Sequence, residues 1–143
     1  MNRNFKPAEY NSVSPYFILK EPQRFIDLMK AVFDAHPLRR YERPDGSIMH
    51  AELRIDDSVI MLSTATKDFT PTTFWMHVYV ADAKATYEKA LAAGCEGIEA
   101  PVNKKDDPDL RGTFKDFAGN MWSIGTQLGE STVDSPQSTA SQG

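Results

Sequence analysis

The stretch TFWMHVYVADAKATYEKALAAG, Thr73 to Gly94, decides the fold. Its first eight residues, which end at Val80, read as a strand. Asp82 is suited to cap the helix that follows, and Gly94 is suited to end it. The stretch therefore predicts one strand followed by one helix.

An earlier stretch, VSPYFILKEPQRFIDLMKAVF, has the same order of strand and helix. Its helix carries an apolar stripe formed by Phe25, Leu28, Met29, Val32 and Phe33. The matching stripe of the second helix lies about 62 residues further on. A repeat of this length in two copies indicates a duplicated supersecondary unit.

Three more strands are expected after each helix. They cover residues 39–42, 48–55 and 58–63 in the first copy and residues 97–102, 111–117 and 121–126 in the second. The predicted fold class is therefore α+β, with two βαβββ modules that form a curved, cup-shaped mixed sheet with the helices on its outer face. The helix-free faces would line a cavity for a small molecule.

The chain has 143 residues, the usual size of one compact domain. Residues 1–11 are expected to be a loose lead-in, and residues 12–128 one domain with modules at about 12–64 and 72–128. The tail, residues 129–143, is rich in Ser, Thr and Gln. It is predicted to be disordered, because it lacks the apolar side chains that would offset the entropy of ordering.

Charge and composition argue against several classes of partner. The net charge is −4, without the basic face that a nucleic-acid-binding protein carries. No apolar run approaches the roughly 18 residues of a membrane span, and the N-terminus lacks a signal-peptide core, so a cytoplasmic protein is expected. Cys95 is expected to be a buried thiol. A solvated mixed-charge loop is expected over Lys104, Lys105, Asp106, Asp107 and Asp109.

Strand alternation predicts which side chains line the cup. Trp122 and Ile124 are expected to lie under a helix, which leaves Ser123 on the opposite face. The same reasoning gives an aromatic lining with a few polar groups, as is typical of small-molecule pockets. The predicted ligand-binding residues are Tyr16, His50, Glu52, Arg54, Met61, Trp75, His77, Tyr79 and Ser123.

The chain resembles the vicinal oxygen chelate superfamily, the fold of glyoxalases, bleomycin-resistance proteins and ring-cleaving dioxygenases. The resemblance covers about Val13 to Thr126 and rests on four stretches in order: VSPYFILKEPQRFIDLMKAVF, DGSIMHAELRIDDSVIMLS, HVYVADAKATYEKALAAG and LRGTFKDFAGNMWSIGT. Within the second, MHAELRIDDSVIML is similar to the PhnB-like subgroup. The resemblance implies paired βαβββ modules and a homodimer with cavities at or near the junction of the modules.

Metal-dependent members of this superfamily take His or Glu ligands from the first, fourth, fifth and eighth strands. The resemblance places Ser14, Met61, Trp75 and Ser123 at these positions. Hydroxyl, thioether and indole groups are poor ligands for a hard or borderline divalent cation. The resemblance therefore implies a member without the family's metal site.

The sequence favours metal-independent binding of a small organic molecule, and the resemblance implies a sequestering, resistance-type or sensing role. The alternative is a lyase, isomerase or dioxygenase in which His77, His50 and Glu52 bind a divalent metal or act as acid–base groups. In a third interpretation the protein is structural and its own side chains fill the cup. The residues leave all three open, including whether the chain is an enzyme.

Overall fold

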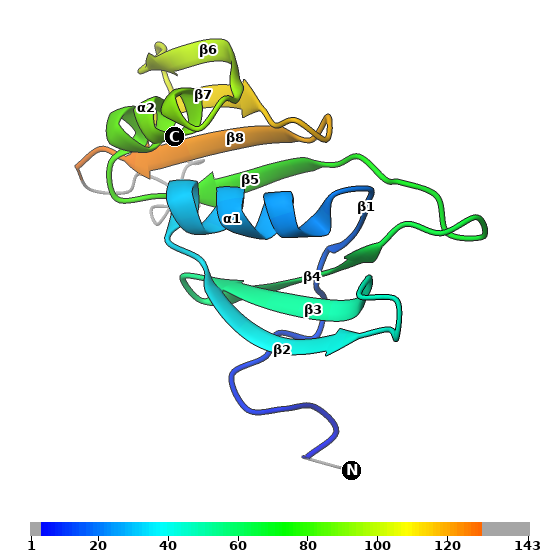
Figure 1. The fold of residues 1–143 in the computed structure, drawn as a ribbon. Coiled ribbons are helices and arrows are strands. Elements are labelled where there is room, and N and C mark those ends of the chain that lie inside the picture. Colours follow the sequence, from blue (N-terminus) through cyan, green and yellow to red (C-terminus); the bar gives the residue numbers. More distant parts are fainter. Residues whose placement is uncertain (1–3, 130–143) are drawn as a thin grey trace. The chain divides into compact units, whose positions relative to one another are not determined.

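The computed structural model describes residues 4–129, so the predicted tail lies outside the described residues except for Gly129. The chain forms two compact units, which meet in sequence between Thr73 and Phe74. Each unit contains one helix and one four-stranded mixed sheet (Figure 1). The predicted α+β class and the duplicated βαβββ module are confirmed. The cup predicted between the modules concerns the placement of the two units and stays a prediction.

The first unit contains β1 (Tyr16–Leu19), α1 (Pro22–Phe33), β2 (His36–Glu42), β3 (Ile48–Ile55) and β4 (Ser58–Thr64). The strand order is β1-β4-β3-β2, with β1 parallel to β4 and the other neighbours antiparallel. Two boundaries differ from the prediction. β1 begins only after Pro15, which has no N–H to donate to a sheet. β2 begins early, because α1 ends at Phe33 and its C-cap residue, Asp34, takes the left-handed conformation (φ 57°).

Helix α1 packs its apolar stripe on β1, β3 and β4. Phe17, Phe25 and Met29 are completely buried, and the rings of Phe17 and Phe25 have centroids 4.8 Å apart. Within this unit the opposite face of the sheet carries no helix. Burial alternates along β1 as predicted, since Phe17 and Leu19 are buried and Tyr16 is exposed. In β3 the predicted helix-facing residues Ala51, Leu53 and Ile55 are buried, but Met49 is exposed and Glu52 is buried as well.

The second unit contains β5 (Trp75–Tyr79), α2 (Ala83–Ala92), β6 (Glu96–Val102), β7 (Asp109–Lys115) and β8 (Met121–Gln127). The strand order is β5-β8-β7-β6, and α2 packs on β6, β7 and β8. Asp82 caps α2 as predicted, because its Oδ1 accepts from Ala85 N at 3.1 Å. Trp122 and Ile124 are buried under α2, as strand alternation predicts. Cys95 is buried as well, and burial raises the pKa of its thiol to about 11.

The turn between β7 and β8 is built around one buried carboxylate. Oδ1 of Asp116 accepts from the backbone N–H groups of Ala118 and Asn120, both at 2.9 Å. Its Oδ2 accepts from Trp122 Nε1 at 2.8 Å and from Asn120 Nδ2 at 3.0 Å. Asn120 Oδ1 in turn accepts from the N–H of Phe74, at 2.8 Å. The turn thereby fixes both the last strand and the chain that enters β5.

One of the two edge strands of each sheet, β2 in the first and β6 in the second, is irregular. The pairing of β2 with β3 shifts register between Pro37 and Arg40, and the pairing of β6 with β7 shifts on both sides of Glu99. Each of these outer strands also contains a proline, Pro37 in β2 and Pro101 in β6. Such shifts bend a strand and interrupt its hydrogen bonds.

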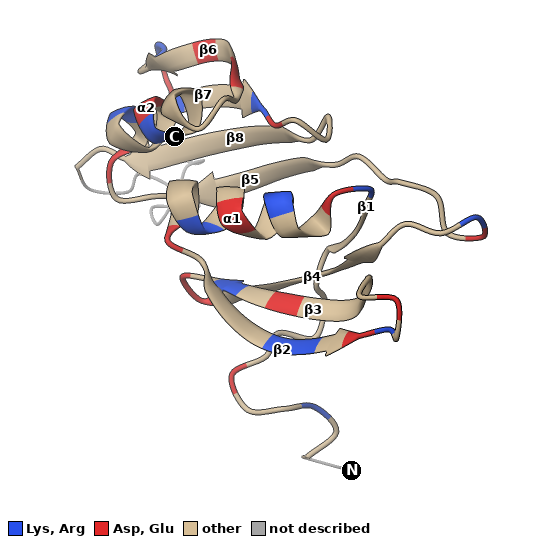
Figure 2. Ribbon diagram, in the orientation of Figure 1, with Lys and Arg blue, Asp and Glu red and all other residues tan. Residues whose placement is uncertain are grey.

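Positive and negative side chains are mixed along α1, α2 and β2 (Figure 2). These elements therefore lack the uniformly basic surface that a phosphate backbone would require. Within residues 4–129, no helix is both long enough and apolar enough to cross a membrane.

Candidate functional site

The helix-free face of the first sheet, called the first open face, brings together five predicted ligand-binding residues. The register aligns Tyr16 of β1 with Met61 of β4, and Met61 with Glu52 of β3. His50 and Arg54 flank Glu52 on the same side of β3, because side chains two apart in a strand share a face. The register therefore brings these five residues together on one face, and their contact with a ligand stays a prediction.

A chain of hydrogen bonds runs across the first open face. The Tyr16 hydroxyl lies 2.9 Å from Nδ1 of His50, and Nε2 of His50 lies 2.8 Å from Oε2 of Glu52. The other carboxylate oxygen of Glu52 accepts from the Tyr10 hydroxyl at 2.6 Å. A carboxylate only accepts, so Nε2 of His50 carries a hydrogen, and in the tautomer with its one ring hydrogen there Nδ1 accepts from Tyr16.

Residues 4–11 contribute to this face, which the sequence did not indicate. Besides the bond from Tyr10 to Glu52, Arg54 Nη1 donates to the Glu9 carbonyl at 2.8 Å. Asn11 Oδ1 accepts from the N–H of Val59 at 3.2 Å. The Tyr10 ring also lies beneath the guanidinium of Arg54, 5.8 Å from its centroid. Tyr10 was missed because its segment has no alternating or helical pattern.

Glu52 is only 2% exposed. Its burial tends to raise the pKa of its carboxyl, but the hydrogen bonds from Tyr10 and His50 outweigh burial and leave the pKa below its ordinary value. The carboxylate is therefore charged at neutral pH, and its charge is stabilised by two side-chain donors.

This lowered pKa predicts a loss of stability in acid. The contribution of Glu52 to folding is complete above the pKa of the unfolded chain, about 4.5, and is lost as the pH falls through the lower folded pKa. The free energy of unfolding of Glu52→Gln should therefore depend less steeply on pH between about pH 6 and 3 than that of the wild type. Denaturant titrations at several pH values measure this. Asp68→Asn, which changes the same charge at an exposed position, should keep the wild-type slope.

The helix-free face of the second sheet, called the second open face, holds the remaining four predicted residues. Trp75, His77 and Tyr79 alternate along β5, and His77 pairs with Ser123 of β8. Trp75 is 69% exposed and Tyr79 is 59% exposed. Two large aromatic side chains are therefore exposed on this face, one on each side of the His77 imidazole. Exposed aromatic groups of this kind commonly mark interaction sites.

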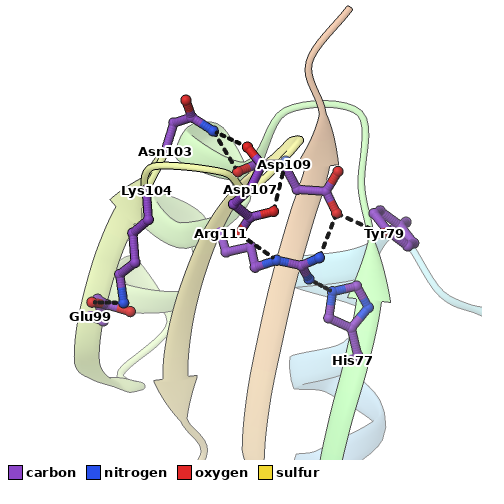
Figure 3. A network of polar contacts seen from close by, with 8 residues as sticks. All are labelled: His77, Tyr79, Glu99, Asn103, Lys104, Asp107, Asp109 and Arg111. Carbon is purple, nitrogen blue, oxygen red and sulfur yellow. Dashed lines mark hydrogen bonds and ion pairs between the residues drawn. The ribbon is translucent and has the colours of Figure 1, made fainter. Parts of the chain in front are cut away.

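Arg111 of β7 organises the polar part of the second open face (Figure 3). Its Nε donates to Asp107 Oδ2 at 2.9 Å and its Nη2 to Asp109 Oδ2 at 2.7 Å. Asp109 Oδ2 also accepts from the Tyr79 hydroxyl at 2.6 Å. The interpretation of this segment as a merely solvated loop was therefore wrong for Asp107 and Asp109. Asp109 is only 2% exposed because Arg111 and Tyr79 satisfy its charge.

The hydrogen bond from Arg111 fixes the protonation of His77. Arg111 Nη1 lies 2.8 Å from Nε2 of His77, and a guanidinium can only donate, so the ring hydrogen is on Nδ1. Burial and, next, the Arg111 charge lower the pKa of His77. Gly125 leaves room for the His77 ring, since a Cβ at this position would lie only 3.2 Å from Nε2 of His77. The second open face therefore presents a neutral imidazole that offers an N–H.

The lowered pKa of His77 can be measured by NMR. The midpoint of the His77 titration should fall below the ordinary value of about 6.5, because burial and Arg111 disfavour the imidazolium. Arg111→Gln should raise the midpoint towards that value while the protein stays folded. The unfolded chain binds the proton first, so acidification below about pH 6.5 should also reduce stability. A midpoint unchanged by Arg111→Gln would contradict the role of the guanidinium.

The residues present do not fit the metal ion of the metal-dependent relatives. The positions implied by resemblance hold hydroxyl, thioether and indole groups, on Ser14, Met61, Trp75 and Ser123. For the displaced set, His50 and Glu52 bind each other in the first unit, and Nε2 of His77 in the second unit faces a guanidinium. Residues 4–129 hold no group of three or more His, Cys, Asp or Glu side chains placed for a metal.

Comparison with known proteins gives the same family as the sequence patterns. Residues 15–124 match the model of the Glyoxalase/Bleomycin resistance protein/Dioxygenase superfamily. The uncharacterized protein Mb0911c of Mycobacterium bovis is 32% identical, over 96% of this chain and 95% of its own. Among solved structures, TioX from Micromonospora sp. ML1 is 21% identical over 82% of this chain and 99% of its own, with a TM-score of 0.69. The fosfomycin resistance protein FosX from Mesorhizobium loti is 16% identical over 89% and 97%, with a TM-score of 0.59. The two structures support the fold.

Proposed function

The chain belongs to the glyoxalase, bleomycin resistance protein and dioxygenase superfamily, and we propose that it binds a small organic molecule without a metal ion. The proposal rests chiefly on one observation: the exposed pair Trp75 and Tyr79 flanks the neutral imidazole of His77 on the second open face. We place the ligand there. We further propose a sequestering, resistance-type or sensing role, membership of the PhnB-like subgroup, a cytoplasmic location and a homodimer.

The groups on the second open face suggest the chemistry of the ligand. The Trp75 indole offers a flat surface on which an aromatic ring can stack. Nδ1–H of His77 has no partner among residues 4–129, so it can donate to a carbonyl or amide oxygen. The charge of Arg111 is already matched by Asp107 and Asp109, which leaves this cluster with a net negative charge. A flat aromatic compound that carries an acceptor oxygen and is neutral or cationic therefore fits best.

Tryptophan fluorescence provides a direct test. The chain has two tryptophans, and Trp122 is 1% exposed, so a ligand in solution reaches only Trp75. A library of flat aromatic amides, first screened by thermal shift, should contain compounds that quench the Trp75 emission saturably and raise the melting temperature. Trp75→Phe keeps the Trp122 emission and should lose the quenching. His77→Gln should weaken binding about tenfold, the effect of one lost hydrogen bond.

Two outcomes would contradict the proposal. A library without any stabilising compound would favour a structural role. A stoichiometric metal in protein purified without a chelating tag, lost in His77→Ala, would favour the metal-dependent alternative.

A further inference from the structure

We propose that Tyr16, His50 and Glu52 form a proton-transfer site on the first open face, in which the phenol oxygen of Tyr16 removes a proton from a small carbon acid. This activity is separate from the binding proposed for the second open face and uses none of its residues. It takes up the acid–base alternative for His50 and Glu52, with Tyr16 rather than a histidine as the reacting group.

The exposure of the three side chains increases from Glu52 through His50 to Tyr16, so the group that meets the ligand is the most exposed. The Glu52 side chain is 2% exposed and that of His50 is 24% exposed, whereas Tyr16 is 38% exposed. A small molecule in solution can therefore reach the phenol but not the carboxylate. The hydrogen bond to Glu52 fixes the orientation of the His50 imidazole, and the hydrogen bond to the imidazole fixes the orientation of the Tyr16 phenol.

The hydrogen bonds also give the direction in which a proton moves. In the tautomer whose one ring hydrogen is on Nε2, where Glu52 accepts it, the Tyr16 hydroxyl donates to Nδ1 of His50. When the phenol oxygen takes a proton from a C–H group, its own proton passes to Nδ1, and the imidazolium forms beside the Glu52 carboxylate. The electron pair of the broken C–H bond stays on the ligand, delocalised into an adjacent carbonyl. Return of the proton to another carbon completes an isomerisation without any co-reactant.

Because the proton ends on Nδ1 of His50, the imidazole is the net base, and the phenol relays the proton from a C–H next to a carbonyl. Two other tyrosines lack the arrangement that would release their proton. Tyr10 and Tyr79 donate to the carboxylates of Glu52 and Asp109, and these hydrogen bonds raise the pKa of both phenols. Tyr16 instead donates to a nitrogen that can accept the proton. Tyr79 is therefore an internal control, since it also lies on an open sheet face.

Covalent labelling measures this difference in the full-length protein. An arylsulfonyl fluoride reacts when the phenol oxygen bonds to sulfur, fluoride leaves and the phenol proton passes to the neighbouring base. Peptide mass spectrometry gives the labelling rate of each of the five tyrosines. Tyr16 should react about tenfold faster than Tyr79, as expected for activation by a hydrogen-bonded base. Exposure alone predicts the opposite order, because Tyr79 is 59% exposed and Tyr16 is 38% exposed.

Two variants connect the rate to the proposed groups. His50→Gln should reduce the Tyr16 rate to that of Tyr79, and Glu52→Gln should reduce it several-fold, while the Tyr79 rate stays unchanged in both. Asp109→Asn should alter the Tyr79 rate and leave that of Tyr16 unchanged. Circular dichroism confirms that each variant is folded. Equal rates for Tyr16 and Tyr79 in the wild type, or an unchanged Tyr16 rate in folded His50→Gln, would overturn the proposal. Neither result would bear on binding at Trp75.

Discussion

Asp116→Ala should lower the free energy of unfolding by about 3 kcal/mol, because one substitution leaves several buried donors without an acceptor. The carboxylate of Asp116 accepts from two backbone N–H groups, from Trp122 Nε1 and from the Asn120 amide. Asp116 is 4% exposed and Asn120 is completely buried, so water cannot replace the lost bonds without opening the turn. Asn120 Oδ1 also accepts a hydrogen bond from the N–H of Phe74, so the loss of structure should extend to the start of β5.

Urea unfolding of Asp116→Ala, followed by tryptophan fluorescence, measures this effect, since both tryptophans belong to the second unit. Asp68→Ala is the matched control. Asp68 is exposed, so its removal should change the free energy of unfolding by no more than about 0.5 kcal/mol. If Asp116→Ala were as stable as this control, the carboxylate would not be the organising group of the turn.

Phe17→Ala should destabilise the first unit by about 4 kcal/mol, the usual range for deleting a buried aromatic ring. Phe17 is completely buried between the sheet and α1, and its ring lies against that of Phe25, with centroids 4.8 Å apart. Removing the ring loses its transfer free energy and leaves a cavity. The neighbouring side chains can fill this cavity only in part, because α1 is held through Phe25 and Met29 as well.

Far-UV circular dichroism should be used for this variant, because the first unit has no tryptophan. Val13→Ala is a suitable control, since Val13 lies just before β1 and is 83% exposed. An effect of Phe17→Ala below about 1 kcal/mol would mean that the site collapses around the missing ring.

Local patterns predicted most of the fold. The stripe of α1, the cap of α2 at Asp82 and the alternation of β5 each depend on residues close in sequence. The boundaries that were missed depend on single backbone features, such as the left-handed Asp34 that lets β2 begin at His36. A composition pattern does not report the dihedral angle of one residue.

The candidate sites could be predicted only in part. Strand alternation placed His50 and Glu52 on one face and His77 and Tyr79 on another, because a period of two decides which face a side chain occupies. Arg111 lies in a predicted strand, but alternation gives only the face of a side chain and not the groups from other segments that it contacts. Its pairing with Asp107, Asp109 and His77 depends on the strand register, which the sequence alone does not give.

The irregular outer strands limit how copies of this chain can assemble. A regular outer strand offers a row of free N–H and C=O groups onto which another molecule can add its own strand, and repeated addition produces fibrils. The proline and the interrupted ladder in β2 and in β6 break that row along one edge of each sheet. We therefore expect the protein to resist polymerisation through these edges, and expect any homodimer to form without a continuous sheet across β2 or β6.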